Sequence, residues 1–113
     1  MNRFAVAESD AAAFVERAHA ALAALAARPG YQRGRLTRAL DDPTCWCLVT
    51  EWESVGAYRR ALGAFEVKVQ ATPLLAESVD EPSAYEVLAG ALPGGDVTVL
   101  PSDRAPGPGR GVG

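Results

Sequence analysis

Residues 44–62, read TCWCLVTEWESVGAYRRAL, constrain the fold more than any other part of the chain. The first ten alternate as in a β-strand, and bulky side chains fall on both of its faces. Trp46, Leu48, Thr50 and Trp52 share one face, and Cys45, Cys47 and Val49 share the other. A strand that is apolar on both faces must be covered on both sides. A short chain with few helices covers one side itself, so we expect a second copy to cover the other.

Length and composition indicate one soluble domain. The chain has 113 residues, of which 49% are hydrophobic and 22% are charged, as is ordinary for globular proteins. Its net charge of −3 gives no electrostatic reason to bind nucleic acid or an anionic membrane. No apolar run approaches the roughly 20 residues of a membrane span. The opening Met-Asn-Arg-Phe does not resemble a secretory signal, so we expect a cytoplasmic protein.

The cysteines favour neither a disulfide nor a metal site. Cys45 and Cys47 lie two apart on one strand, which separates them by about 6–7 Å and suits a disulfide poorly. A metal would need further Cys or His ligands, and the only histidine is His19 on the first predicted helix. We therefore expect reduced, packed cysteines and no metal, with His19 at the helix surface.

The periodicity predicts a βαββαβ order. Strands are expected over 3–7, 31–40, 44–53 and 83–89, and helices over 11–28 and 55–71. Gly63 is expected to weaken the second helix, and Pro73 to end it. This is the ferredoxin-like α+β arrangement, in which two helices cover one face of an antiparallel four-stranded sheet. We expect the open face to keep bulky side chains, tryptophan included, and to pair as a homodimeric α+β barrel.

The composition changes near residue 90. Residues 1–90 are expected to form the ferredoxin-like domain, and the Gly- and Pro-rich tail over 91–113 to be largely disordered. Val97, Val99 and Leu100 could add a short strand or an arm that binds a partner.

Several short motifs resemble the antibiotic biosynthesis monooxygenase family. The family's strand-to-helix junction is similar to Glu51-Trp52-Glu53-Ser54 followed by Ala57-Tyr58-Arg59. Its entry into strand two is similar to Pro29-Gly30-Tyr31. Its hairpin is similar to Arg38-Ala39-Leu40-Asp41-Asp42-Pro43. The resemblance runs from about Phe4 to Leu88 and implies a dimeric α+β barrel. It also implies cofactor-free oxygenation of polyketide phenols and anthrones, or haem degradation.

The resemblance implies Trp52 and Tyr58 as catalytic residues. Quinone-forming members also carry an asparagine four positions before that tryptophan, which hydrogen-bonds a developing oxyanion. This chain has Leu48 there, which cannot donate a hydrogen bond. Trp46, Leu48, Thr50, Arg35 and Phe65 are the expected substrate-binding residues, and no cofactor or metal is implied.

Haem degradation is not favoured. Haem-degrading members need a histidine and a tryptophan on the second helix and an asparagine on strand one. The predicted helix over 55–71 has neither residue, and Asn2 lies ahead of the predicted strand.

Three functions remain open. The first is a cofactor-independent monooxygenase acting on a small aromatic or polyketide-like substrate. The second is a non-catalytic dimeric module that binds small molecules, and the third is a polyketide cyclase. A tryptophan such as Trp52 is more often a core or interface residue than one that stacks on a substrate. Arg33 and Arg35 either steer an anionic ligand or pair with acidic side chains.

Overall fold

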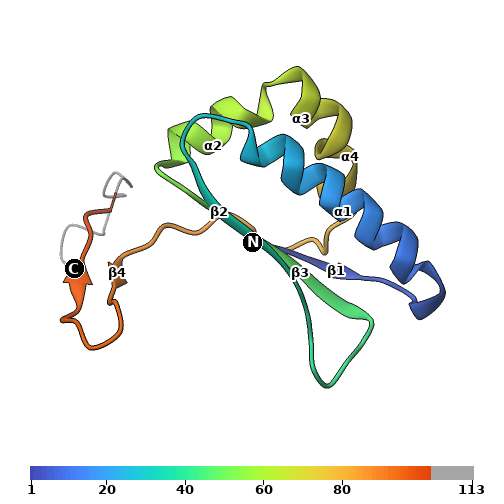
Figure 1. The fold of residues 1–113 in the computed structure, drawn as a ribbon, viewed down its shortest axis with the longest axis horizontal. Coiled ribbons are helices and arrows are strands. Elements are labelled where there is room, and N and C mark those ends of the chain that lie inside the picture. The colour runs from blue at the N-terminus through green and yellow to red at the C-terminus, as the bar shows by residue number, and fades with distance from the viewer. Residues whose placement is uncertain (103–113) are drawn as a thin grey trace, which may run out of the picture.

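A computed structural model describes residues 1–102. In chain order the elements are β1 (Asn2–Ala5), the 3-10 turn η1 (Glu8–Asp10), α1 (Ala11–Ala26), β2 (Tyr31–Arg38), β3 (Cys45–Trp52), α2 (Val55–Leu62), α3 (Phe65–Gln70), α4 (Thr72–Leu75), β4 (Ala89–Gly90) and β5 (Thr98–Val99). The helices pack on one face of the sheet formed by the first three strands (Figure 1). The α+β ferredoxin-like fold is thus confirmed. No helix within residues 1–102 is long and apolar enough to cross a bilayer.

The main sheet has three strands in the single chain, in the antiparallel order β1-β3-β2. The fourth strand expected over 83–89 does not join it, and β4 and β5 pair only with each other. Residues 79–83 instead run along the outer edge of β1. There the Val79 N–H donates to the Arg3 carbonyl (2.7 Å) and the N-terminal ammonium donates to the Ser83 carbonyl (2.6 Å). Pro82 has no N–H to donate, so a continuous ladder cannot form along this segment.

Both tryptophans lie on the helix-covered face, which corrects the expectation that the open face carries tryptophan. Trp46 is only 8% exposed, and its ring lies 5.4 Å from that of Phe14 on α1, which in turn lies 5.1 Å from Phe4. The β3 face with the larger side chains packs against α1, because this arrangement buries more apolar surface than the opposite one would. The open face is left with Cys45, Cys47 and Val49.

A bulge near the start of β2 reverses the orientation of one residue. Tyr31 lies opposite Trp52, but Arg33 lies opposite Glu51, so β2 has one extra residue at this point. Simple alternation places Tyr31 on the face of Arg33. The bulge places it on the helix-covered face with Gly34 instead.

The predicted second helix is broken into two, and a third short helix follows it. α2 ends at Leu62 before Gly63, and α3 starts at Phe65 with a new helical phase. Val67 is therefore completely buried, whereas Phe65 is 75% exposed. Pro73 does not end a helix but lies in the first turn of α4, where a missing N–H costs nothing.

Candidate functional site

The junction between β3 and α2 brings the two predicted catalytic residues together. The Ser54 hydroxyl accepts a hydrogen bond from the Ala57 N–H (3.1 Å) and caps α2, so the first turns of the helix lie beside the end of β3. Tyr58 consequently packs against Trp52, with ring centroids 5.6 Å apart. This proximity follows from local sequence, because only five residues separate the two rings.

A third ring completes an aromatic cluster of Tyr31, Trp52 and Tyr58. Tyr31 meets Trp52 edge-on, with centroids 5.3 Å apart and an interplanar angle of 85°. Beneath the cluster, the Trp52 indole N–H donates to the Thr50 hydroxyl at 2.9 Å. The indole donor therefore already has a partner within the protein. Sequence alternation missed Tyr31 because it does not reveal the bulge.

Tyr58 also lines an open hollow of about 700 Å³ beside α2, α3 and α4. The other lining residues are Asn2, Leu62, Lys68, Thr72, Leu75, Ala76, Ser78 and Ser83. Trp52 does not line the hollow and contacts it only through its packing against Tyr58. Burial raises the pKa of the Tyr58 hydroxyl, so this phenol remains a neutral hydrogen-bond donor at physiological pH.

Asn2 was missed by the sequence analysis, which placed it ahead of the first strand. It is the first residue of β1 and lies directly opposite Leu48. Residues directly opposite in a sheet share a face, so Asn2 lies on the helix-covered side, where its amide donates to the Ser78 hydroxyl (3.3 Å). Asn2 thus supplies a side-chain amide next to Leu48, which has no amide of its own.

The other predicted site residues do not line the hollow. Trp46 and Leu48 are buried in the core, and Thr50 lies under Trp52. Phe65 is exposed at the start of α3, and Arg35 is exposed on the open face of the sheet. Its neighbour Arg33 forms an ion pair with Glu51 (3.0 Å) on that same face. The structure therefore separates the arginines from the aromatic cluster.

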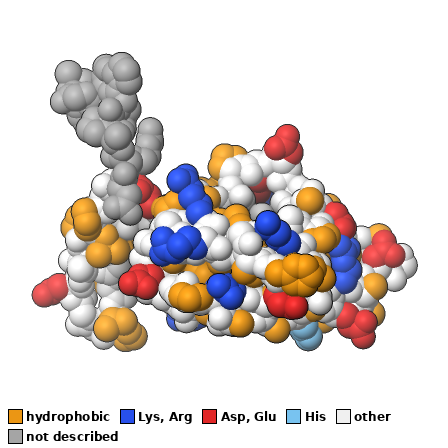
Figure 2. Space-filling view, turned by 90° about the horizontal axis from the view of Figure 1, so that it is seen from above, with side chains coloured by type: hydrophobic (Ala, Val, Ile, Leu, Met, Phe, Trp, Pro, Cys, Tyr) orange, Lys and Arg blue, Asp and Glu red, His pale blue; other side chains and the backbone are white. Residues whose placement is uncertain are grey.

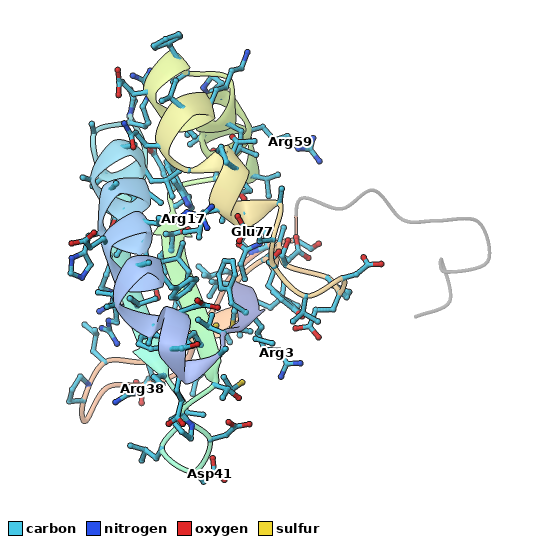
Figure 3. The ribbon with its side chains drawn as sticks, turned by 90° about the vertical axis from the view of Figure 1, so that its right-hand side faces the viewer. Arg3, Arg17, Arg38, Asp41, Arg59 and Glu77 are labelled. Atoms are coloured by element: carbon cyan, nitrogen blue, oxygen red, sulfur yellow. The ribbon has the colours of Figure 1, made fainter. Side chains whose placement is uncertain are left out.

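The wall of the hollow is tied to α1. Arg17 on α1 and Glu77 after α4 point toward one another and form a bidentate ion pair (Figure 3). This exposed pair contributes little stability by itself, but it holds the segment that carries Ser78. Among the residues that the structure describes, the one cation lining the hollow is Lys68. Within residues 1–102, no group of three or more His, Cys, Asp and Glu side chains is arranged to hold a metal ion.

Comparisons with known proteins decide the family. Residues 1–69 match the family model described as antibiotic biosynthesis monooxygenase. The chain belongs to the antibiotic biosynthesis monooxygenase family. No curated protein matches the chain.

Solved structures of the family have the same fold. One is SnoaB, a cofactor-independent oxygenase from Streptomyces nogalater, with 31% identity over 77% of this chain and 91% of that chain and a TM-score of 0.60. A mutant of SnoaB aligns over 92% of this chain and 90% of its own, with 24% identity and a TM-score of 0.60. A putative antibiotic biosynthesis monooxygenase from Nitrosomonas europaea has 19% identity over 71% of this chain and 83% of that chain, with a TM-score of 0.57.

Proposed function

We propose that this chain is a cofactor-independent monooxygenase that oxidises a small, phenolic, polyketide-like molecule bound in the Tyr58 hollow. One observation carries the proposal: Asn2 and Tyr58 place an amide and a neutral phenol on one hollow backed by the aromatic cluster. SnoaB is described as a cofactor-independent oxygenase, and the similarity of this chain to it supports the same class of reaction. A hollow of about 700 Å³ falls within the usual range for small-molecule sites.

The proposed reaction converts a ring CH₂ beside a phenol or ketone into C=O. Loss of a C–H proton gives a carbanion delocalised onto oxygen, which transfers an electron to O₂. The resulting radical and superoxide combine to form a C–O bond, and the peroxide takes up a proton. Cleavage of its O–O bond with loss of the second C–H proton gives the carbonyl and one water. The substrate supplies the electrons, and O₂ is the oxidant.

The chain's part in this reaction is to bind the substrate and stabilise its oxyanion. A substrate oxygen near Asn2 would accept a hydrogen bond from the amide, and the Lys68 ammonium would lower the energy of the negative charge. The Tyr58 phenol would donate to the same oxygen or to the peroxide. Leu62 and Leu75 would contact the apolar rings.

We further propose that the active form is a cytoplasmic homodimer that buries the open face of the sheet. Cys45, Cys47 and Val49 are only partly buried in the single chain. Specific interfaces usually bury about 1,200–2,000 Å² in total, and a second sheet packed on this face would supply area of that order.

A non-catalytic binding module is the second candidate, and the Trp52 geometry favours it. The indole N–H is occupied by Thr50, and Trp52 is not on the wall of the hollow. A protein that holds an aromatic molecule between Tyr58 and Leu75 needs neither an oxyanion nor O₂. A polyketide cyclase would use the same hollow to fold its substrate.

Oxygen uptake with an anthrone as substrate separates these candidates. A monooxygenase consumes one O₂ for each quinone formed, and Tyr58→Phe lowers the rate at least tenfold. Phe65→Ala removes an exposed aromatic ring from the neighbouring helix and leaves the rate unchanged. Quinone formation that is equal in the wild type and Tyr58→Phe would show that the site is wrong. A rise in Tm with the anthrone but no oxygen uptake would favour the binding module, and an oxygen-independent ring closure would favour the cyclase.

A further inference from the structure

The Ser78 side chain takes part in two hydrogen bonds on the wall of the hollow. Its hydroxyl donates to the Leu75 carbonyl at 2.7 Å and accepts from the Asn2 side-chain amide at 3.3 Å. A carbonyl oxygen cannot donate, so the Ser78 proton points to Leu75 and the lone pairs of the hydroxyl oxygen are left for Asn2. The order of donors and acceptors is therefore fixed and runs from Asn2 through Ser78 to Leu75.

This order decides which end of the Asn2 amide faces Ser78. With its proton directed at Leu75, the hydroxyl can only accept, so Nδ2 of Asn2 faces it. Rotation of the amide by a half-turn would set Oδ1 against the hydroxyl oxygen with no proton between them. Ser78 binds one hydrogen of Nδ2, and the second has no partner within residues 1–102. Because Asn2 lines the hollow, this second hydrogen is available to a ligand there.

The segment that carries Ser78 is anchored on both sides. Glu77, before it, forms the ion pair with Arg17 on α1. Val79, after it, donates its backbone N–H to the Arg3 carbonyl of β1 at 2.7 Å. The hydroxyl is therefore held at a constant place relative to α1 and β1, which allows it to orient a neighbouring side chain on β1.

The surface around the hollow provides little other directional control. Figure 2, which views the molecule from its helix side, shows basic, acidic and hydrophobic side chains interspersed over the body of the molecule. A mixed surface does not set up the single-sign field that would orient a substrate. The Lys68 ammonium attracts an anion as a point charge on a flexible stem. The direction of a hydrogen bond to the substrate therefore comes from the Tyr58 phenol and the Asn2 amide.

We propose that Ser78 is a positioning residue, which locks the Asn2 amide so that an N–H is available to the hollow. The inference rests on the function proposed above, in which this N–H donates to the substrate oxyanion. An amide that presents Nδ2 stabilises developing negative charge, whereas one that presents Oδ1 repels it. Because the locked amide offers only a donor, the hollow selects a ligand with an acceptor oxygen at this position, such as a phenolate or a ketone.

The orientation of the amide can be measured without turnover in full-length protein. Asn2 is the only asparagine and Gln32 and Gln70 are the only glutamines, so the NMR spectrum of side-chain amides holds few signals. Asn2→Ala identifies the Asn2 pair by its loss. We expect Ser78→Ala to speed exchange of this pair with water about two- to tenfold, the range that one neutral hydrogen bond accounts for.

Two further variants serve as controls for this measurement. Ser78→Thr keeps a hydroxyl at the same position and should retain the wild-type exchange rate. Ser9→Ala removes an exposed hydroxyl in η1, outside the hollow, and should also leave the Asn2 signals unchanged.

A double-mutant cycle tests whether Ser78 acts through Asn2. With an anthrone as substrate, Ser78→Ala should lower kcat about two- to tenfold with little change in KM, because the lost orientation matters in the transition state. In the Asn2→Ala background the same change should have no effect, since no amide remains to be oriented. Ser78→Thr and Ser9→Ala should retain the wild-type kcat. A general loss of packing would instead lower kcat equally in both backgrounds.

The outcomes separate this inference from the proposed function. Equal Asn2 exchange in the wild type and Ser78→Ala, or an equal loss of kcat in both backgrounds, would overturn the role of Ser78 and leave the monooxygenase proposal standing. Faster Asn2 exchange in Ser78→Ala, in a wild-type protein that consumes no O₂ with the anthrone, would overturn the monooxygenase and keep the amide orientation. Thermal denaturation verifies that each variant folds. Should Ser78→Ala unfold, Ser78→Cys replaces the hydroxyl with a weakly hydrogen-bonding thiol and provides the same comparison.

Discussion

The Tyr31 hydroxyl occupies the space that a side chain at Gly34 would fill. A Cβ added to Gly34 would collide with this hydroxyl and approach Leu22 Cδ2 to 2.8 Å. The bulge turns Tyr31 onto the helix-covered face, and Gly34 leaves room there for the Tyr31 hydroxyl. The orientation of Tyr31 therefore depends on both features. Together they position the ring that packs edge-on against Trp52.

Gly34→Ala is accordingly expected to destabilise the fold by about 1–3 kcal/mol through overpacking. Combining it with Tyr31→Phe removes the hydroxyl and should recover part of this loss. Gly63→Ala is the control: Gly63 has ordinary helical φ and ψ, and its new Cβ would lie 3.4 Å from the Arg60 carbonyl oxygen. This control should be neutral or more stable by about 0.4–1 kcal/mol. Urea denaturation measures all three, and equal stability of Gly34→Ala and the wild type would contradict the packing argument.

Asn2→Ala is expected to lower the turnover of an anthrone by about 100-fold, the usual cost of losing one oxyanion donor. Because Asn2 is only partly buried and its amide makes a long hydrogen bond to Ser78, stability should change little. Steady-state kinetics and thermal denaturation on the same sample separate the two effects. A loss of stability that matches the loss of rate would assign Asn2 a structural role.

The ionisation of Tyr58 gives a pH-dependent prediction. Burial raises the pKa of its phenol, so the folded chain keeps a proton that the unfolded chain loses near pH 10. Stability should therefore be fully present below about pH 10 and fall as pH rises through the folded pKa. Ultraviolet titration of phenolate should show a late phase that Tyr58→Phe removes and denaturant abolishes. A late phase that survives in Tyr58→Phe would refute the assignment.

The thiols on the open face test where the dimer forms. Burial raises the pKa of Cys47, which lowers its thiolate fraction and slows its reaction with a disulfide reagent. Covering the open face in a dimer would slow Cys45 and Cys47 further, so dilution to the monomer should accelerate labelling of both. Labelling in denaturant gives the reference rate for the two thiols. Rates that do not depend on protein concentration would place the interface elsewhere.

Sequence periodicity predicted the first helix and the first three strands to within a few residues, because each keeps its apolar pattern over most of its length. Trp52 and Tyr58 were singled out by the family resemblance and not by periodicity, and the Ser54 cap brings the two rings into contact locally. Periodicity failed where one residue changes the phase. The bulge between Tyr31 and Arg33 and the helix break at Gly63 each reversed the orientation of an aromatic residue, placing Tyr31 in the site and Phe65 in solvent.

By itself, the sequence determined the order of the elements from β1 to α2, the apolar sets on β3 and the junction that carries Trp52 and Tyr58, because these depend on residues near one another in the chain. Only the tertiary structure decided which set of β3 faces the helices, that Asn2 lies opposite Leu48, and that the predicted fourth strand does not join the main sheet of the single chain. These depend on pairing between distant segments, which is fixed by how much surface each alternative buries and by which backbone groups it satisfies.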